Sequence, residues 1–185
     1  MKMDKVANSG NDEFYTPLYA ITPLIKYLKD KEFRTIWCPF DTEESLFVKI
    51  LSKEGFNVIN THIEKENGDF FKLINSDFPT NNGVDAIVSN PPYSLKAEVL
   101  DSLFSSKIPF AMLLGVVGIF ESKRRFNLFK NNPFEIMYMD KRVSYFMDYS
   151  EQKPSKNPPF SSVYITSNVL PSQIVFEEID KKKLK

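Results

Sequence analysis

The sequence predicts an α/β protein with a mostly parallel sheet and helices on both of its faces. Short apolar, β-branched segments alternate along the chain with segments of helical periodicity, and this alternation is typical of βαβ units. Two tetrapeptides strengthen the prediction. "CPFD" (38–41) and "NPPY" (90–93) each follow an apolar segment, and in parallel sheets ligands bind beyond the carboxyl ends of the strands.

Four elements are expected within residues 14–63. Residues 14–30 carry apolar side chains at helical spacing, with prolines near the start, where a helix tolerates them. "RTIWCPF" (34–40) is short, apolar and β-branched, which predicts a strand. Residues 42–55 predict an amphipathic helix with acids in its first turn and Gly55 at its end. "NVINTHI" (57–63) predicts a second strand.

The second half continues the alternation. Apolar segments predict strands, and the segments between them have the spacing of helices. The polar, proline-bearing stretch "SEQKPSKNPP" predicts a loop before the last strand. The expected strands are 84–90, 108–119, 134–140 and 161–169, and the expected helices are 95–107 and 121–132.

Length and composition narrow the class of protein. A chain of 185 residues with 17 Phe predicts a single domain, 1–185, whose residues 1–13 we expect to be mobile. With 24 basic and 24 acidic residues, nucleic acid would have to bind at local basic patches. One Cys and one His argue against a disulfide framework and against a zinc site, so no metal is expected. No apolar run reaches transmembrane length, which predicts a cytoplasmic protein with no membrane partner.

"NPPY" has the residue types needed to activate an exocyclic amine. Such an amine is a poor nucleophile because its lone pair is delocalised into the ring. Asn90 offers a side-chain carbonyl and Pro91 a backbone carbonyl, which together can accept from both N–H groups. Pro91 and Pro92 stiffen the loop, and Tyr93 offers a flat face for a base. The alternative is an ordinary turn, in which the prolines only end a strand.

This motif resembles the catalytic motif of S-adenosylmethionine-dependent amino-methyltransferases, chiefly the DNA adenine-N6 enzymes. "NDEFYTP" (11–17) is similar to the opening segment of these enzymes, and "CPFDTEES" (38–45) resembles the cofactor loop of the EcoRI-type adenine methyltransferases. The resemblance covers most of residues 11–170. It implies a Rossmann-like class I methyltransferase fold with a seven-stranded sheet, and S-adenosylmethionine as the cofactor.

The resemblance also assigns cofactor-binding residues. It places an aromatic-Thr-Pro stretch against the cofactor, and it maps the Cys-x-x-Asp-x-x-x-Ser pattern onto the loop after the first strand. Asp41 would hold the ammonium group with support from Ser45, while Asp69 would accept from the adenine amine and Phe70 would stack. Glu64 is the candidate for the ribose hydroxyls, although it comes two or three places late. The implied set is Phe14, Tyr15, Thr16, Pro17, Cys38, Pro39, Phe40, Asp41, Ser45, Glu64, Asp69 and Phe70.

The sequence departs from many methyltransferases at one point, because no Gly-x-Gly follows the first strand. A non-catalytic protein with the same fold, binding nucleic acid or a partner subunit, is therefore an open alternative. Methylation of RNA or of a protein glutamine by the same site is another. We expect DNA as the substrate. Since few residues follow position 140, a partner subunit for target recognition is also considered.

Substrate contacts are expected in the loop 141–160. Arg142, Lys153 and Lys156 are its candidate phosphate contacts, with an ordinary β-hairpin as the alternative. "PPFSSVYI" (158–165) resembles a late motif near the base pocket, which assigns Phe160 to substrate binding. "SKRRF" (122–126) is interpreted as a solvated helix face, with a phosphate contact as the alternative.

Overall fold

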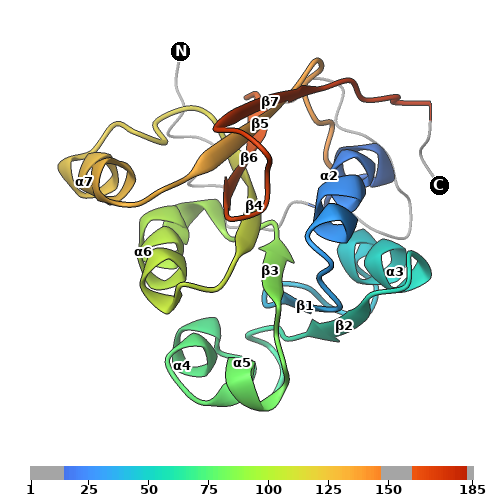
Figure 1. Cartoon of the computed structure of the whole chain (residues 1–185), viewed down its shortest axis with the longest axis vertical. Helices are drawn as coiled ribbons and strands as arrows, with labels where there is room; N and C mark the ends of the chain where they lie inside the picture. The colour runs from blue at the N-terminus through green and yellow to red at the C-terminus, as the bar shows by residue number, and fades with distance from the viewer. Residues whose placement is uncertain (1–14, 147–159, 183–185) are drawn as a thin grey trace.

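The computed structural model describes residues 15–146 and 160–182, and within them one sheet runs through the molecule (Figure 1). The sheet has seven strands in the order β2-β1-β3-β4-β6-β5-β7. All neighbouring strands are parallel except at β6, which is antiparallel to both β4 and β5. The strands are β1 (Thr35–Cys38), β2 (Asn57–Asn60), β3 (Ala86–Ser89), β4 (Phe110–Gly115), β5 (Glu135–Met139), β6 (Ser162–Ser167) and β7 (Ile174–Glu177).

Helices cover both faces of the sheet, as the sequence predicts. One apolar layer joins helices α2 and α3 to side chains such as Ile36 and Val88 of the sheet. The other layer joins α4, α6 and α7 to Trp37 and Ile87, which point the opposite way. The helices are α2 (Leu18–Asp30), α3 (Leu46–Lys53), α4 (Phe70–Ile74), α5 (Phe78–Asn81), the 3₁₀ helix η1 (Tyr93–Leu95), α6 (Lys96–Ser106) and α7 (Lys123–Asn131).

The strands are shorter than predicted, and proline and glycine account for two of the differences. β1 ends at Cys38 because Pro39 has no N–H to continue the ladder. The expected strand 108–119 ends at Gly115, after which Gly118 adopts φ +71° in a turn. The predicted helix over 42–55 begins later, at Leu46, because Ser45 caps it by accepting from Phe47 N at 3.2 Å.

Three elements were not predicted. The short helices α4 and α5 lie between β2 and β3, and β7 follows the strand that was expected to be the last. β7 is an edge strand whose Ile174 and Phe176 are 51% and 77% exposed. The prediction of a strand depends on apolar side chains that alternate with polar ones and face the core. A strand whose apolar side chains are exposed lacks this pattern.

Successive strands of the chain are added first on one side of β1 and then on the other. From β1 the chain passes through α3 to β2 on one side, then returns through α4 and α5 to β3 on the other side of β1. β1 and β3 are therefore neighbours, paired at Ile36–Ala86 and Trp37–Ile87. Ligands of open α/β sheets bind beyond the carboxyl ends of the strands at such a reversal. "CPFD" and "NPPY" follow these two strands.

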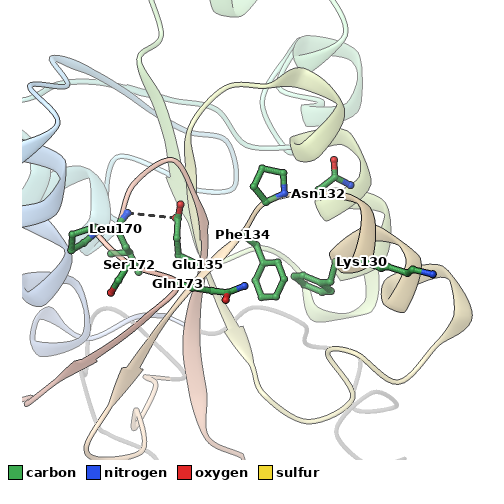
Figure 2. Close-up of a pocket in the computed structure, with 10 residues that line it drawn as sticks. Lys130, Asn132, Phe134, Glu135, Leu170, Ser172 and Gln173 are labelled. Carbon is green, nitrogen blue, oxygen red and sulfur yellow. Dashed lines mark hydrogen bonds between the residues drawn. The ribbon is translucent and has the colours of Figure 1, made fainter.

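A hollow of about 430 Å³ lies at the opposite edge of the sheet (Figure 2). Its lining includes Phe134 and Glu135 at the amino end of β5, and Leu170 and Gln173 from the turn between β6 and β7. Separately, no helix in the described part of the chain is long and apolar enough to span a membrane.

Candidate active site

Asp41 is a buried carboxylate at the carboxyl end of β1. It is 7% exposed, and its two oxygens accept hydrogen bonds from the hydroxyls of Ser45 and Ser89. Ser45 precedes α3, whereas Ser89 is the last residue of β3, 48 residues away in sequence. The predicted support of Asp41 by Ser45 is thus present as a hydrogen bond. The contact with Ser89 ties the loop after β1 to the residue directly before Asn90.

Burial shapes the ionisation of Asp41. Removal of the carboxyl from water raises its pKa to about 6, against the hydrogen bonds from Ser45 and Ser89 and the charge of His62, which lower it. The negative form is therefore costly at neutral pH, and a cation placed beside it would stabilise it. Since a carboxylate can accept about four hydrogen bonds, two hydroxyl donors leave capacity for a further donor.

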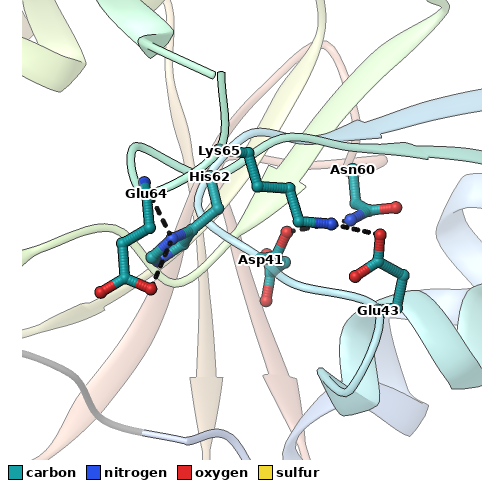
Figure 3. Close-up of polar contacts among 6 residues, drawn as sticks. All are labelled: Asp41, Glu43, Asn60, His62, Glu64 and Lys65. Atoms are coloured by element: carbon teal, nitrogen blue, oxygen red, sulfur yellow. Dashed lines mark hydrogen bonds and ion pairs between the residues drawn. The ribbon is translucent and has the colours of Figure 1, made fainter. Parts of the chain in front are cut away.

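The end of β2 forms the wall beside Asp41 (Figure 3). The Asn60 side-chain amide donates to the Asp41 backbone carbonyl at 3.3 Å. Thr61 N donates to Cys38 O at 3.1 Å, and Asp41 N donates to Thr61 O at 3.2 Å. These bonds extend the β1–β2 pairing beyond the strands, and they fix the backbone that carries Asp41.

Glu64 points away from this wall. Its side chain is 77% exposed and lies 3.7 Å from His62 Nδ1, and Figure 3 shows it on the far side of His62 from Asp41. The turn 62–65 carries the Glu64 carboxylate outwards to solvent, and its predicted contact with the ribose hydroxyls stays a prediction. At the carboxyl end of β2 the polar side chains are instead those of Asn60 and Thr61.

An aromatic cluster lies behind the loop after β1. Phe70 is only 3% exposed, and its ring contacts Phe40 at 4.8 Å and Trp37 at 5.7 Å between centroids. Phe40 is half-buried and lies against it. Phe70 is therefore part of the core and Phe40 is the more exposed ring of the two, and the stacking role assigned to Phe70 stays a prediction.

Asp69 and Cys38 make structural contacts, and their predicted binding roles stay predictions. Asp69 caps α4 by accepting from Phe71 N at 3.0 Å, and it lies 3.5 Å from Lys72 Nζ. Gly68, the residue before Asp69, lies very close to the backbone of His62, because a Cβ on Gly68 would lie 1.9 Å from His62 O. Cys38 is fully buried, and this burial raises the pKa of its thiol well above the usual value. Its side chain belongs to the core.

The "NPPY" loop leaves β3 at the same edge. Pro91 is buried, and Tyr93 begins the 3₁₀ helix η1. The Tyr93 hydroxyl donates to the Tyr145 hydroxyl at 3.0 Å, which in turn donates to Ser162 Oγ at 2.7 Å. Burial raises the pKa of Tyr145 to about 12, so this phenol stays protonated at neutral pH.

Phe160 holds the ring of Tyr93 in place. The two rings meet edge to face with centroids 5.2 Å apart. Gly115, at the end of β4, makes room for Phe160, because a Cβ at Gly115 would lie 3.1 Å from that ring. Phe160 thus lies beside "NPPY", and its predicted role as a substrate contact stays a prediction.

The segment before α2 reaches the same edge. Tyr15 and Phe146 form an antiparallel bridge, with Phe146 N donating to Tyr15 O at 2.9 Å. Thr16 is 3% exposed, and its hydroxyl has no hydrogen-bond partner among the described residues. Pro17 precedes α2 and is buried. Phe14 lies outside the described residues.

Of the predicted substrate contacts, only two can be located. Arg142 is exposed, and the four residues after it are buried in an irregular stretch. Phe160 lies beside Tyr93. Lys153 and Lys156 lie outside the described residues, as do most of the loop 141–160 and all of residues 1–13.

Sequence reasoning missed Ser89, Asn60 and Tyr145. Ser89 and Asn60 are the last residues of their strands, where polar groups meet at a common edge. Their position at the end of a strand could therefore have identified both residues from the sequence. Tyr145 had none, because its partners Tyr93 and Ser162 are 52 and 17 residues away.

The comparisons with known proteins add no family assignment. The sequence matches no protein-family model and no curated protein. In the described residues, no group of three or more His, Cys, Asp or Glu side chains is arranged to hold a metal ion. The functional argument therefore depends on the residues of this chain.

Proposed function

We propose that the protein transfers a methyl group from S-adenosylmethionine to the N6 amine of adenine in DNA, on a Rossmann-like class I methyltransferase fold. One observation carries the proposal. A buried carboxylate that suits a cation, Asp41, is hydrogen-bonded to Ser89, the residue before Asn90, at the reversal of strand order. A cofactor site and an amine-binding loop would therefore share one edge of the sheet.

The described residues fit the polar end of the cofactor. Asp41 is buried with a raised pKa, so an ammonium group beside it would relieve the cost of its charge. Thr16 offers a buried hydroxyl that has no partner among residues 15–146 and 160–182. Asn60 and Phe40 border the loop and would contact the nucleoside part.

The role of the chain in the reaction is to orient and polarise the amine. When bound, S-adenosylmethionine would supply a methyl group on a positively charged sulfur: an N–C bond would form as the S–C bond breaks, neutral S-adenosylhomocysteine would leave, and the amine would lose a proton to solvent. Asn90 and the Pro91 carbonyl would accept from the two N–H groups, drawing the nitrogen out of conjugation. Because Pro91 and Pro92 fix the loop in advance, these acceptors need no reorganisation during the reaction.

Tyr93 would supply the stacking face for the base. Its hydroxyl bonds to Tyr145 and its ring packs edge-on against Phe160, so the plane of the ring is fixed from two sides. The N6 amine is paired inside a duplex, and the enzyme must therefore flip the base or act on single strands.

A methyl-transfer panel tests the proposal. Radiolabelled S-adenosylmethionine is offered with DNA, RNA and protein acceptors, after calorimetric titration of the protein with S-adenosylhomocysteine. We expect cofactor binding and label in DNA on adenine N6. Label only in RNA or in glutamine would keep the chemistry and change the substrate. Cofactor binding with no transfer to any acceptor would favour a non-catalytic binding protein, and no cofactor binding would refute the proposal.

A further inference from the structure

The segments that follow β3 and β4 expose several large apolar side chains. Seven large apolar side chains are exposed in the described part of the chain, and four belong to the segments that follow β3 and β4. We call these four the apolar rim. They are Leu95 (39% exposed), Val117 (42%), Phe120 (40%) and Phe126 (57%).

Two cations converge at this rim from different helices. Lys96, the first residue of α6, donates from Nζ to Val117 O at 3.3 Å. Arg125, in the first turn of α7, donates from Nε to Gly118 O at 3.0 Å. Lys96 comes three residues after Tyr93 in the sequence. Both charges are therefore held on the loop 116–121, beside the proposed amine-binding site.

The two cations repel each other. Partial burial and the charge of Arg125 lower the pKa of Lys96, and Glu121 offsets this only in part. No salt bridge involves Lys96 or Arg125 among the described residues. An anion between them would remove the repulsion.

The adjacent Arg124 is a useful contrast. It bonds to Glu98 at 2.8 Å and to Asp101 at 2.9 Å, so it joins α7 to α6. "SKRRF" thus divides into one arginine that holds the fold together and one that is directed at the loop beside "NPPY". Lys123, Arg124 and Phe126 are exposed, as expected for a solvated helix face, whereas Arg125 is partly buried.

We propose that Lys96 and Arg125 form a phosphodiester-binding pair that holds the nucleic-acid backbone beside Asn90, with the apolar rim contacting bases or sugars. The combination of cations and exposed aromatic side chains is that of single-strand binding surfaces. The pair supplies the local basic site that a chain of zero net charge needs. This inference rests on the proposed function, because it assigns the substrate class of the same site.

The test is the salt dependence of oligonucleotide binding. Fluorescence anisotropy is measured with a labelled single-stranded DNA, the matching RNA and the duplex DNA, for wild type and the Lys96→Gln/Arg125→Gln double variant. Loss of two phosphate contacts should reduce the slope of log affinity against log salt by about 1.8 for duplex DNA and about 1.4 for single strands. At 0.1 M salt the affinity of the double variant for duplex DNA should be about 60-fold below that of wild type. This factor is the slope difference of about 1.8 applied over one decade of salt concentration.

A matched control removes the same charge at the opposite edge of the sheet. Lys31 and Lys107 are exposed and follow α2 and α6, before β1 and β4 begin. Lys31→Gln/Lys107→Gln should keep the wild-type slope, and so should the charge-preserving Lys96→Arg/Arg125→Lys variant. If the Gln double variant fails to fold, Lys96→Gln alone should reduce the duplex slope by about 0.9.

The outcomes separate this inference from the proposed function. An unchanged slope in the Lys96→Gln/Arg125→Gln variant, in a protein that binds cofactor and methylates DNA, would overturn the inference alone. A reduced slope without methyl transfer would support the inference and refute the enzyme. Failure of the wild-type protein to bind any of the three oligonucleotides would overturn the inference. A reduced slope with RNA only would retain the pair and assign it to RNA.

Discussion

Two carboxylates at opposite edges of the sheet, Glu135 and Asp41, are held by different kinds of donors. Glu135, beside the hollow at the amino end of β5, accepts from Thr166 Oγ1 at 2.6 Å and from the backbone N–H groups of Asn168 and Leu170 at 2.9 and 3.5 Å. Figure 2 shows its bond to Leu170. Its donors belong to the end of β6 and the turn after it, so this carboxylate holds that turn in place.

Asp41 is bonded differently. Its donors are two serine hydroxyls from separate segments, and its burial raises its pKa to about 6. Both hydroxyl donors of Asp41 can rotate, whereas Glu135 has one hydroxyl donor and several backbone amides, which cannot, so the surroundings of Asp41 can adapt more readily to a ligand. The hollow of Figure 2 therefore lies beside the carboxylate that holds a turn, and the proposed chemistry is expected at the other edge. Four predictions test this contrast, and a fifth tests the support of "NPPY".

The largest effect is expected from Asn90→Ala. Loss of one preorganised acceptor should reduce methyl-transfer turnover by roughly 100- to 1000-fold, by analogy with oxyanion-hole deletions. Affinity for S-adenosylhomocysteine should stay near wild type. Asn132→Ala, the same substitution beside the hollow, is the matched control and should leave turnover unchanged. Wild-type turnover in Asn90→Ala would contradict the mechanism.

The next effect is on stability, through the pKa of Asp41. An unfolded Asp titrates near 3.9, whereas the folded carboxyl titrates at about 6. Between these values only the folded state binds the proton, so folding stability falls as the pH rises through this window. Relative to Asp41→Asn, wild type should lose up to about 3 kcal/mol between pH 4 and pH 7. Denaturant unfolding of both proteins from pH 4 to 8 measures this loss, and a difference that is independent of pH would argue against the raised pKa.

Glu135→Ala should also destabilise the fold, but without affecting the site. The buried Thr166 hydroxyl and the backbone donors of the turn would lose their acceptor, which costs about 2 kcal/mol. Urea titration would detect the loss, and calorimetry should show unchanged affinity for S-adenosylhomocysteine. Weakened cofactor binding would mean that the two edges are not independent.

Asp41→Ala should weaken S-adenosylhomocysteine binding by at least tenfold, about 1.4 kcal/mol, because the ammonium group loses its counter-charge. The wild-type affinity should itself fall as the pH drops below about 6, where the carboxyl becomes protonated. Calorimetry across this range measures both effects. Unchanged affinity in the variant would remove Asp41 from the site.

The smallest effect is expected from Tyr93→Phe. The sequence argument requires only the ring and predicts a nearly silent change, but the hydroxyl donates to Tyr145. Its loss should cost about 1 kcal/mol of stability. Turnover should change little, because the ring and its contact with Phe160 remain. A large loss of turnover at unchanged stability would assign the hydroxyl a role in the reaction.

Local sequence determined the class of fold and the position of the two key loops. Alternating apolar segments predicted strands and helices because each pattern repeats within a few residues. "CPFD" and "NPPY" could be assigned to one edge because parallel strands all end on the same side. The link between Asp41 and Ser45 was also accessible, since they are four residues apart.

Tertiary structure decided which of these residues meet and which turn away. Strand order placed β1 beside β3, and only then could Ser89 reach Asp41 across 48 residues. Packing buried Phe70 behind Phe40, and the turn after β2 carried Glu64 out to solvent. Lys96 and Arg125 donate to adjacent carbonyls, those of Val117 and Gly118, because the loop after β4 lies against both α6 and α7. The pattern along the chain indicates whether a side chain faces the core or the solvent. Which residues it contacts depends on segments that are far apart in sequence.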